Sequence, residues 1–383
     1  MYLKDTENKI NGLGLEDSGA RLLPEGTVFL SRTASVGFSG IMDKEMATSQ
    51  DFANWVCGDQ VVSEYLVYIF RSMDQEFSRL MQGSTHQTIY MPDIESLQMP
   101  LPPVEEQQKI ASYLNDNVKK IYDLIQKKES LMDILEEKQQ AVITQTVTEG
   151  VDSDLGMEDS EIEWLDEVPI PCDVTKLKYI VQSDTPVYGI LKPGPEVEDG
   201  IPYIGAGDIV QGRLSIDELP RTSPEIAEEY QRTKMNSGEL VYAIRGSYGD
   251  VEVLPEELSG VNLSRDAARI SPKDNIDSEW LCWALKSEIA QQQVELSATG
   301  SAVNGVNIGD LKQLILPVPP IKEQKEIAAY LNDFESKISQ LRDAIEEEIT
   351  LLQEKRQALI WKTVTGKIDL AEWQQHDSID ISL

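Results

Sequence analysis

The chain is poor in cysteine, in histidine and in long hydrophobic runs, and each shortage excludes a class of protein. The three cysteines, Cys57, Cys172 and Cys282, are odd in number and far apart, which excludes a disulfide framework and a CxxC metal site. We expect buried thiols instead. With only His86 and His376, a histidine-rich metal site is also excluded. No apolar run approaches the roughly 20 residues of a membrane helix, and no signal peptide is recognisable, so we expect a cytoplasmic protein.

Positive charge is scarce as well. The 383 residues include 34 Lys and Arg against 67 Asp and Glu, a formal net charge of -33. Taken alone, this argues against nucleic acid as a partner, because duplex DNA is itself densely negative. Acidic surfaces are also typical of halophilic proteins, whose repulsion concentrated salt screens. We interpret the charge as halophilic, which leaves room for a local basic or polar groove that binds DNA.

The common catalytic motifs are missing. The sequence has no GxxxxGK[ST] phosphate loop, no GxSxG elbow and no HExxH pair. Gly205-Ala206-Gly207 lacks the third glycine of a dinucleotide fingerprint. We therefore assign no catalytic residue and no metal ligand to this chain.

What the chain does have is an internal repeat. The segment PPVEEQQKIASYLND from Pro102 recurs as PPIKEQKEIAAYLND from Pro319, with ten of fifteen positions identical. EKQQAVITQTVT from Glu137 and EKRQALIWKTVT from Glu354 lie at the same offset of 217 residues. The two blocks are copies of one element.

Each copy has the pattern of a long helix. Pro-Pro pairs and glutamates mark the start, and apolar residues follow at spacings of three, four and seven. Such a narrow stripe suits a partner helix, and the simplest partner is the other copy. The alternative is that each helix packs only on its own adjacent domain. The predicted interface residues are Ile110, Leu114, Ile121, Leu124, Ile327, Leu331, Ile338 and Leu341.

The segments before the two helices are repeated more weakly. PEGTVFLSRTASVGFSG from Pro24 aligns with NSGELVYAIRGSYGDVE from Asn236 at an offset of 212, so the segments differ by insertion as well as substitution. Apolar runs predict strands at Thr27 to Leu30, Glu239 to Ile244 and Leu314 to Val318. Helices are expected at Ser63 to Arg71 and Ser278 to Gln292. The fold class we predict is α+β, with two α+β domains separated by two long antiparallel, coiled-coil-like helices.

The domain boundaries follow from this pattern. The acidic, unpatterned stretch from Asp152 to Glu163 is predicted as a linker or surface loop. We expect a first domain at 1–103, a central helix at 104–150, an acidic linker at 151–162, a second domain at 163–320, a distal helix at 321–370 and a tail at 371–383.

In this order, the motifs resemble the specificity subunits of type I restriction-modification systems. The resemblance covers nearly the whole chain, and rests on the duplicated helix starts and ends, SGARLLPEGTVFLSRTASVG from Ser18, TSQDFANWV from Thr48 and GIPYIGAGDI from Gly200. It implies a non-catalytic DNA-binding subunit with two target-recognition domains, each reading half of a split double-stranded DNA sequence, and helices that act as a ruler.

The resemblance also implies partners. Modification (methyltransferase) subunits would bring S-adenosylmethionine, and a restriction (translocase and nuclease) subunit would use ATP and Mg²⁺, while this chain would hold no cofactor.

The leading segment of the second half, from Glu163, has no counterpart ahead of Lys4. We therefore expect the first recognition domain to be incomplete at its N-terminus, by roughly 50 residues on the repeat logic.

Candidate DNA-binding residues lie at predicted loop tips of the two domains, where side chains could meet base edges. The alternative for these loops is plain strand-to-strand turns with solvated arginines, and Arg265 or Arg269 could equally pair with carboxylates such as Asp266. The candidates are Arg32, Thr33, Ser35, Thr85, His86, Gln87, Arg245, Ser247, Tyr248, Arg265, Ser301 and Asn304.

Two other functions stay open from the sequence. One is a helical interaction scaffold of the same complex that has lost specific DNA recognition. The other is a hydrolytic enzyme acting on nucleic acid unaided, which none of the motifs supports.

Overall fold

The chain divides into two compact units, each built from one globular domain and one part of each long helix. The computed structural model describes residues 1–81, 87–152, 156–162, 164–209, 214, 216–298, 305–371 and 373. The first unit comprises Met1–Leu131 and Asp343–Leu383, and the second comprises Met132–Arg342. The division cuts both long helices, α5 (Val104–Glu149) and α12 (Ile321–Val364), so each unit is described by itself.

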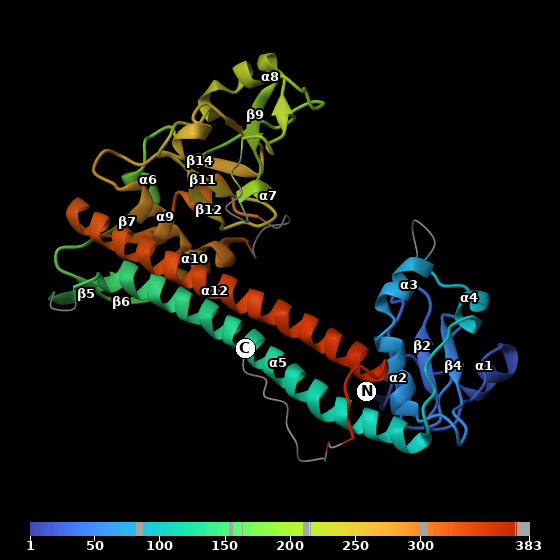
Figure 1. Cartoon of the computed structure of the whole chain (residues 1–383). Helices are drawn as coiled ribbons and strands as arrows, with labels where there is room; N and C mark the ends of the chain where they lie inside the picture. Colours follow the sequence, from blue (N-terminus) through green and yellow to red (C-terminus); the bar gives the residue numbers. More distant parts are fainter. Residues whose placement is uncertain are drawn as a thin grey trace. The chain divides into compact units, whose positions relative to one another are not determined.

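The domain of the first unit is a four-stranded sheet covered by helices (Figure 1). The strand order is β1-β3-β2-β4, with β1 parallel to β3 and the other pairs antiparallel. Helix α2 is buried along Tyr65 to Phe70 because the sheet contacts one face and α5 and α12 contact the other. The elements are β1 (Tyr2–Leu3), α1 (Gly12–Asp17), β2 (Val28–Ser31), β3 (Ser39–Met42), β4 (Phe52–Trp55), α2 (Ser63–Arg71), α3 (Asp74–Leu80) and α4 (Met91–Glu95).

The domain of the second unit contains a central sheet of order β12-β11-β14-β8 and a smaller sheet of order β10-β9-β13. A further strand pair, β15-β7, precedes α12 in the chain. Its elements are β7 (Asp173–Lys176), α6 (Leu177–Ile180), β8 (Val187–Tyr188), β9 (Ile201–Ile204), α7 (Ala206–Ile209), β10 (Arg221–Thr222), α8 (Pro224–Glu229), η1 (Gln231–Thr233), β11 (Leu240–Ala243), β12 (Val251–Val253), η2 (Glu256–Leu258), β13 (Asn262–Leu263), β14 (Ala267–Ile270), α9 (Ser278–Lys286), α10 (Glu288–Ala298), α11 (Ile308–Leu311) and β15 (Ile315–Val318).

The two domains share a core arrangement. Strands β2, β3 and β4 correspond to β11, β12 and β14, with the same pairing, and α2 and α4 correspond to α9 and α11. The offset is 212 residues at Gly26 and Gly238, and 217 at Thr88 and Gly305. Part of the difference lies between β3 and β4, where the second domain inserts η2 and β13. The predicted strands and helices were confirmed, except that the second predicted helix is interrupted at Ser287.

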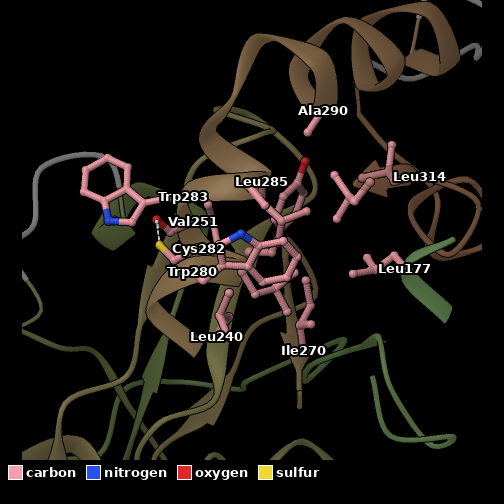
Figure 2. Packing of buried hydrophobic residues seen from close by; sticks show 14 of the residues in the cluster. Leu177, Leu240, Val251, Ile270, Trp280, Cys282, Trp283, Leu285, Ala290 and Leu314 are labelled. Atoms are coloured by element: carbon pink, nitrogen blue, oxygen red, sulfur yellow. Dashed lines mark hydrogen bonds between the residues drawn. The ribbon is translucent and has the colours of Figure 1, made fainter. Parts of the chain in front are cut away.

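The second domain has a dense apolar core around Trp280, which is fully buried (Figure 2). Trp280 lies on α9 among Leu240, Ile270 and Leu285, so the helix is packed against the central sheet. The Cys282 thiol is buried there and lies 3.6 Å from the carbonyl oxygen of Val251. Cys57 and Cys172 are only partly buried, so the expectation of three buried thiols was wrong for two of them.

In the first unit, the helices α5 and α12 pack in antiparallel register. Ile110 and Leu114 share a buried cluster with Ile360 and Val364 of α12 and with α2, while Ile121 packs against Leu352. Leu124 is partly buried beside the same seam. These α5 residues therefore contact both the other helix and their own domain.

The second unit repeats this pattern with the helices exchanged. Ile327 and Leu331 of α12 lie in the core of the second domain together with Ile143 and Val147 of α5. Ile338 is buried, but Leu341 is 44% exposed, so its prediction as a packed interface residue was wrong. Apolar spacings of three and of four residues both fit the sequence of this helix. Its buried side contains Ile338 and Ile345 instead of Leu341.

Polar side chains tie the long helices to the domains. In the first unit, the Gln357 amide nitrogen of α12 donates to the carbonyl oxygen of Arg71, at 2.7 Å. In the second unit, the Gln140 amide of α5 donates to the carbonyl oxygen of Lys286, at 2.9 Å. Asn115 and Asn332 each accept a hydrogen bond from an aromatic side chain, from Tyr68 at 2.9 Å and Trp283 at 2.7 Å. These equivalent hydrogen bonds show that the two domains are joined to the long helices in the same way.

Two remaining features concern the predicted boundaries. Strands β5 (Met157–Ile162) and β6 (Leu165–Pro169) form a hairpin, so the acidic stretch predicted as a linker or loop contains a strand. Helix α12 ends at Val364, before the predicted residue 370. Within the described ranges, none of the helices combines the length and apolar character needed to cross a bilayer.

Candidate nucleic-acid interface

The two loop pairs that the sequence singled out meet in the structure. In the first domain, residues 32–38 follow β2 and residues 87–89 precede α4, and Thr33 forms an antiparallel bridge with Thr88. The Ala34 amide donates to the carbonyl of Gln87 at 3.1 Å, and the Ile89 amide donates to that of Arg32 at 2.8 Å. We call these two segments the paired loops of the first domain.

The second domain contains the same pair, formed by residues 244–250 and 305–306. Arg245 bridges Gly305, and the Val306 amide donates to the carbonyl of Ile244 at 2.8 Å. A Cβ atom on Gly305 would lie 2.6 Å from that carbonyl oxygen, so this approach requires glycine. The paired loops are therefore a shared feature of both domains rather than a coincidence of sequence.

Positive φ angles give the first loop of each pair the same shape. Ala34 and Gly246 have φ of 61° and 72°, and Gly37 and Gly249 have φ of 89° and 103°. Ala34 occupies a conformation that favours glycine, which is uncommon for a residue with a side chain. Each loop closes on the preceding strand, where the Gly37 amide donates to Ser31 and the Gly249 amide to Ala243, both at 3.0 Å.

Arg32 and Arg245 do not occupy equivalent positions, although the sequence places an arginine in both loops. Hydrogen bonding aligns Arg32 with Ile244, and Thr33 with Arg245. The Arg32 guanidinium donates to the carbonyls of Gln50 at 2.8 Å and Ile89 at 3.4 Å, so it holds the loops together. The Arg245 side chain is exposed, and the described residues offer it no hydrogen bond or ion pair.

The other predicted loop residues differ in exposure. Ser35 and Gln87 are exposed, Thr33 is partly buried, and the Ser247 hydroxyl donates to the carbonyl of Ala206 at 3.3 Å. Tyr248 packs against the apolar core of the second domain, which leaves only part of its side chain accessible. Thr85, His86, Ser301 and Asn304 lie outside the described residues.

A third segment lies beside the paired loops in each domain. The carbonyl of Asp51, just before β4, accepts from the amide of Arg32 at 2.8 Å, and Asp266, just before β14, accepts from Ile244 at 2.8 Å. Arg265 is thus brought next to Arg245, and both are exposed. Its first-domain counterpart, Gln50, was not among the sequence candidates. The signal was available, because Ser49-Gln50-Asp51 and Ser264-Arg265-Asp266 share a Ser-x-Asp pattern.

Arg269 has a structural role instead. It is nearly buried, forms ion pairs with Asp184 at 3.2 Å and Glu239 at 3.3 Å, and donates to the carbonyl of Arg232. The alternative of carboxylate pairing therefore describes Arg269, whereas among the described residues the Arg265 side chain has no such partner.

Three carboxylates of the second domain lie near Tyr203 of β9. Burial, and then the carboxylates of Glu196, Asp208 and Asp266, raise the pKa of Tyr203. Arg245 and Arg265 are exposed, and the described residues provide no salt bridge to either guanidinium. Nowhere in the described ranges do His, Cys, Asp and Glu side chains gather as a metal site would require.

A model of the type I restriction modification DNA specificity domain matches residues 2–131 and 177–351. The EcoBI specificity subunit of Escherichia coli is 28% identical over 72% of this chain and 59% of its own length, so the match spans less than two thirds of that relative. The MjaIX specificity subunit of Methanocaldococcus jannaschii is 24% identical over 97% of this chain and 84% of its own length.

Solved structures show the same fold. A chain from work on complex assembly and conformational transition of the type I R-M system has a TM-score of 0.73 at 18% identity, covering 93% of this chain and 86% of its own. The HsdS subunit from Thermoanaerobacter tengcongensis has a TM-score of 0.50 at 17% identity, covering 91% and 82%. Since the family model matches most of the residues, this chain belongs to the family of type I restriction modification DNA specificity domains.

Proposed function

We propose that the chain is a sequence-specific DNA-binding subunit that reads one half of a split target with each domain and has no catalytic centre of its own. The observation that carries this proposal is the duplication of the paired loops. Each domain presents Thr33 or Arg245 at the bridge between two loops, on a backbone held by the same hydrogen bonds. A rigid platform with exposed polar side chains is what base recognition in the major groove requires.

The proposal includes partners. Modification subunits would methylate the target, using S-adenosylmethionine, and a restriction subunit would supply the ATP- and Mg²⁺-dependent functions. Exposed apolar side chains on the long helices, among them Tyr122, Ile134, Leu351 and Trp361, offer contact surface for such subunits.

Selection of DNA sites tests the function. The chain would be co-expressed with its modification subunit, purified in high salt and incubated with a random duplex library, and the bound sequences would be read. A split motif with two defined halves is the expected result. A stable complex that enriches no sequence would contradict DNA reading and favour the helical scaffold, whereas metal-dependent cleavage by the isolated chain would favour a nuclease.

A further inference from the structure

Gln50 and Arg265 occupy the same structural position in the two domains. Each is the middle residue of a Ser-x-Asp turn that leads into an equivalent strand, β4 or β14. The aspartate that follows closes the pairing with the first of the paired loops, through the carbonyl oxygens of Asp51 and Asp266. One residue further from the sheet, Gln50 therefore lies beside Thr33 in the first domain. In the second domain, Arg265 lies beside Arg245 in the same way.

The backbone of this turn is fixed on both sides. In the first domain, the Asp51 amide donates to the Ser49 hydroxyl at 3.2 Å, and Arg32 donates to the carbonyl of Gln50 at 2.8 Å. In the second, the Ser264 amide donates to the carbonyl of Ile204 at 2.9 Å, and the Ser264 carbonyl accepts from Gly189 and Ala267. A turn held in this way presents its central side chain from a rigid base.

The two central side chains are themselves free. Gln50 and Arg265 are exposed, and no hydrogen bond or ion pair joins the Gln50 amide or the Arg265 guanidinium to any described side chain. Gln50 also lines a surface groove together with Arg21, Thr48, Ser49 and Asp51, whose carboxylate accepts from the Ser49 hydroxyl. Arg21 is exposed, and the described part of the chain provides no salt bridge to it. Hydroxyls and a cation beside an exposed amide suit a DNA backbone next to a base edge.

We infer that Gln50 and Arg265 are equivalent base-reading residues, and that the difference between an amide and a guanidinium makes the two halves of the target differ at one position. Gln pairs in a bidentate manner with the N6 and N7 atoms of adenine, and Arg with the O6 and N7 atoms of guanine. The half-site of the first domain would contain adenine at this position and that of the second domain guanine. This inference rests on the proposed function.

Reciprocal substitution tests the inference. Gln50→Arg and Arg265→Gln would be made in the full chain, purified with the modification subunit and put through site selection from the random duplex library. The expected result is a change from adenine to guanine at one position of the first half-site for Gln50→Arg, and the reverse change in the other half-site for Arg265→Gln. The preference ratio at that position should change by roughly tenfold to a hundredfold, as for one bidentate contact.

Matched controls separate charge from position. Gln98→Arg adds a positive charge to the first domain at a different exposed position. Arg232→Gln removes a positive charge from the second domain at a different exposed position. Neither should alter base preference. Gln50→Ala and Arg265→Ala should abolish the preference at the one position and leave the rest of the motif, and thermal melting with co-purification would check that each variant folds.

Three results have distinct meanings. If the swapped variants keep the wild-type preferences, or if binding changes by the same factor on every sequence, the two residues are not readers and the inference is overturned, while the proposed function stands. If the wild-type complex enriches no motif, the proposed function fails, and the inference fails with it.

Discussion

Gln107 and Gln324, at the same place in the two copies of the repeated helix start, form the same set of hydrogen bonds in the two units. The Gln107 side-chain oxygen accepts from the amide of Val62 at 2.9 Å, and its nitrogen donates to the carbonyls of Gln60 and Pro102. Gln324 accepts from the amide of Asp277 at 2.8 Å and donates to Asn275 and Pro319. Both glutamines are buried, so each fastens the start of a long helix to the start of α2 or α9.

Replacing Gln107 by alanine should lower the free energy of unfolding of the first unit by about 1–3 kcal/mol, because the buried groups it satisfies lose their partner. Urea unfolding followed by tryptophan fluorescence would measure the change. Gln126→Ala on the same helix, which removes only an exposed hydrogen bond to Tyr122, is the control and should change little. Equal unfolding midpoints for the two variants would contradict the role of Gln107.

Leu352→Ala should destabilise the helix pair of the first unit far more than Leu351→Ala. Leu352 is fully buried against Ile121 and Ile125, whereas its neighbour is 44% exposed. Removing a buried leucine side chain costs about 2–5 kcal/mol, and removing an exposed one costs roughly 0.5 kcal/mol or less. Urea unfolding of the two variants gives a direct comparison, and similar losses would show that the helices do not pack along this line.

Gly305→Ala should disrupt the paired loops of the second domain. The added Cβ would meet the carbonyl oxygen of Ile244 at 2.6 Å and the Arg245 side chain at 3.1 Å, so the bridge must open. We expect a stability loss of about 1–3 kcal/mol, and weaker binding to the second half-site. Gly309→Ala, where the Cβ meets nothing within 4 Å, is the control. The loop assignment would not survive if both variants bound DNA like the wild type.

Arg245→Ala should weaken binding to the second half-site by roughly tenfold to a hundredfold, the range for one base contact. Arg32→Ala should act differently, because its guanidinium bonds the loop backbone. For Arg32→Ala we expect a lower melting temperature. We also expect weaker base preferences across the whole first half-site, rather than loss of the preference at one position. Binding of duplexes with single base changes, together with thermal melting, would distinguish the two effects. Identical losses for Arg245→Ala on matched and scrambled sites would refute a reading role.

The Cys282 thiol should be inert in the folded protein. Burial raises its pKa from the ordinary value of 9.0 to about 12, so the thiol stays protonated and unreactive near pH 8. Its contribution to stability is complete below pH 9 and is lost as the pH rises toward 12, because the unfolded chain ionises first. Labelling with a thiol reagent at about pH 8, followed by mass spectrometry, should modify Cys282 only after denaturation. Rapid modification of the native chain would contradict the buried position.

The repeat predicted most of the fold because its pattern is local. Strands such as Leu240–Ala243 and helices such as Ser63–Arg71 have uniform apolar runs bounded by turn residues, and both were found where expected. The hairpin at 157–169 was missed since its first strand is acidic and does not alternate. Leu341 was misplaced because two helical spacings fit the sequence equally well.

The candidate site was only partly predictable. Sequence similarity found both loops of each pair, but not that Thr33 bridges Thr88 or that Arg245 bridges Gly305, which depends on tertiary folding. Arg32 and Arg245 aligned as residue types although they differ by one position, and successive residues of an extended chain point to opposite sides. This shift of one residue explains why the Arg32 side chain bonds the loop backbone, whereas the Arg245 side chain is exposed.

The hydrogen bonds between the long helices and the domains determine which parts of a domain can change. The partners of Gln107, Gln324, Gln140 and Gln357 in these hydrogen bonds are main-chain groups, which every sequence provides. Substitution of domain side chains therefore leaves these four glutamines their bonding partners, whereas the bonds from Tyr68 to Asn115 and from Trp283 to Asn332 depend on the side chain present. A domain with the same backbone and an aromatic donor facing Asn115 or Asn332 could therefore be attached to these helices in place of the present one.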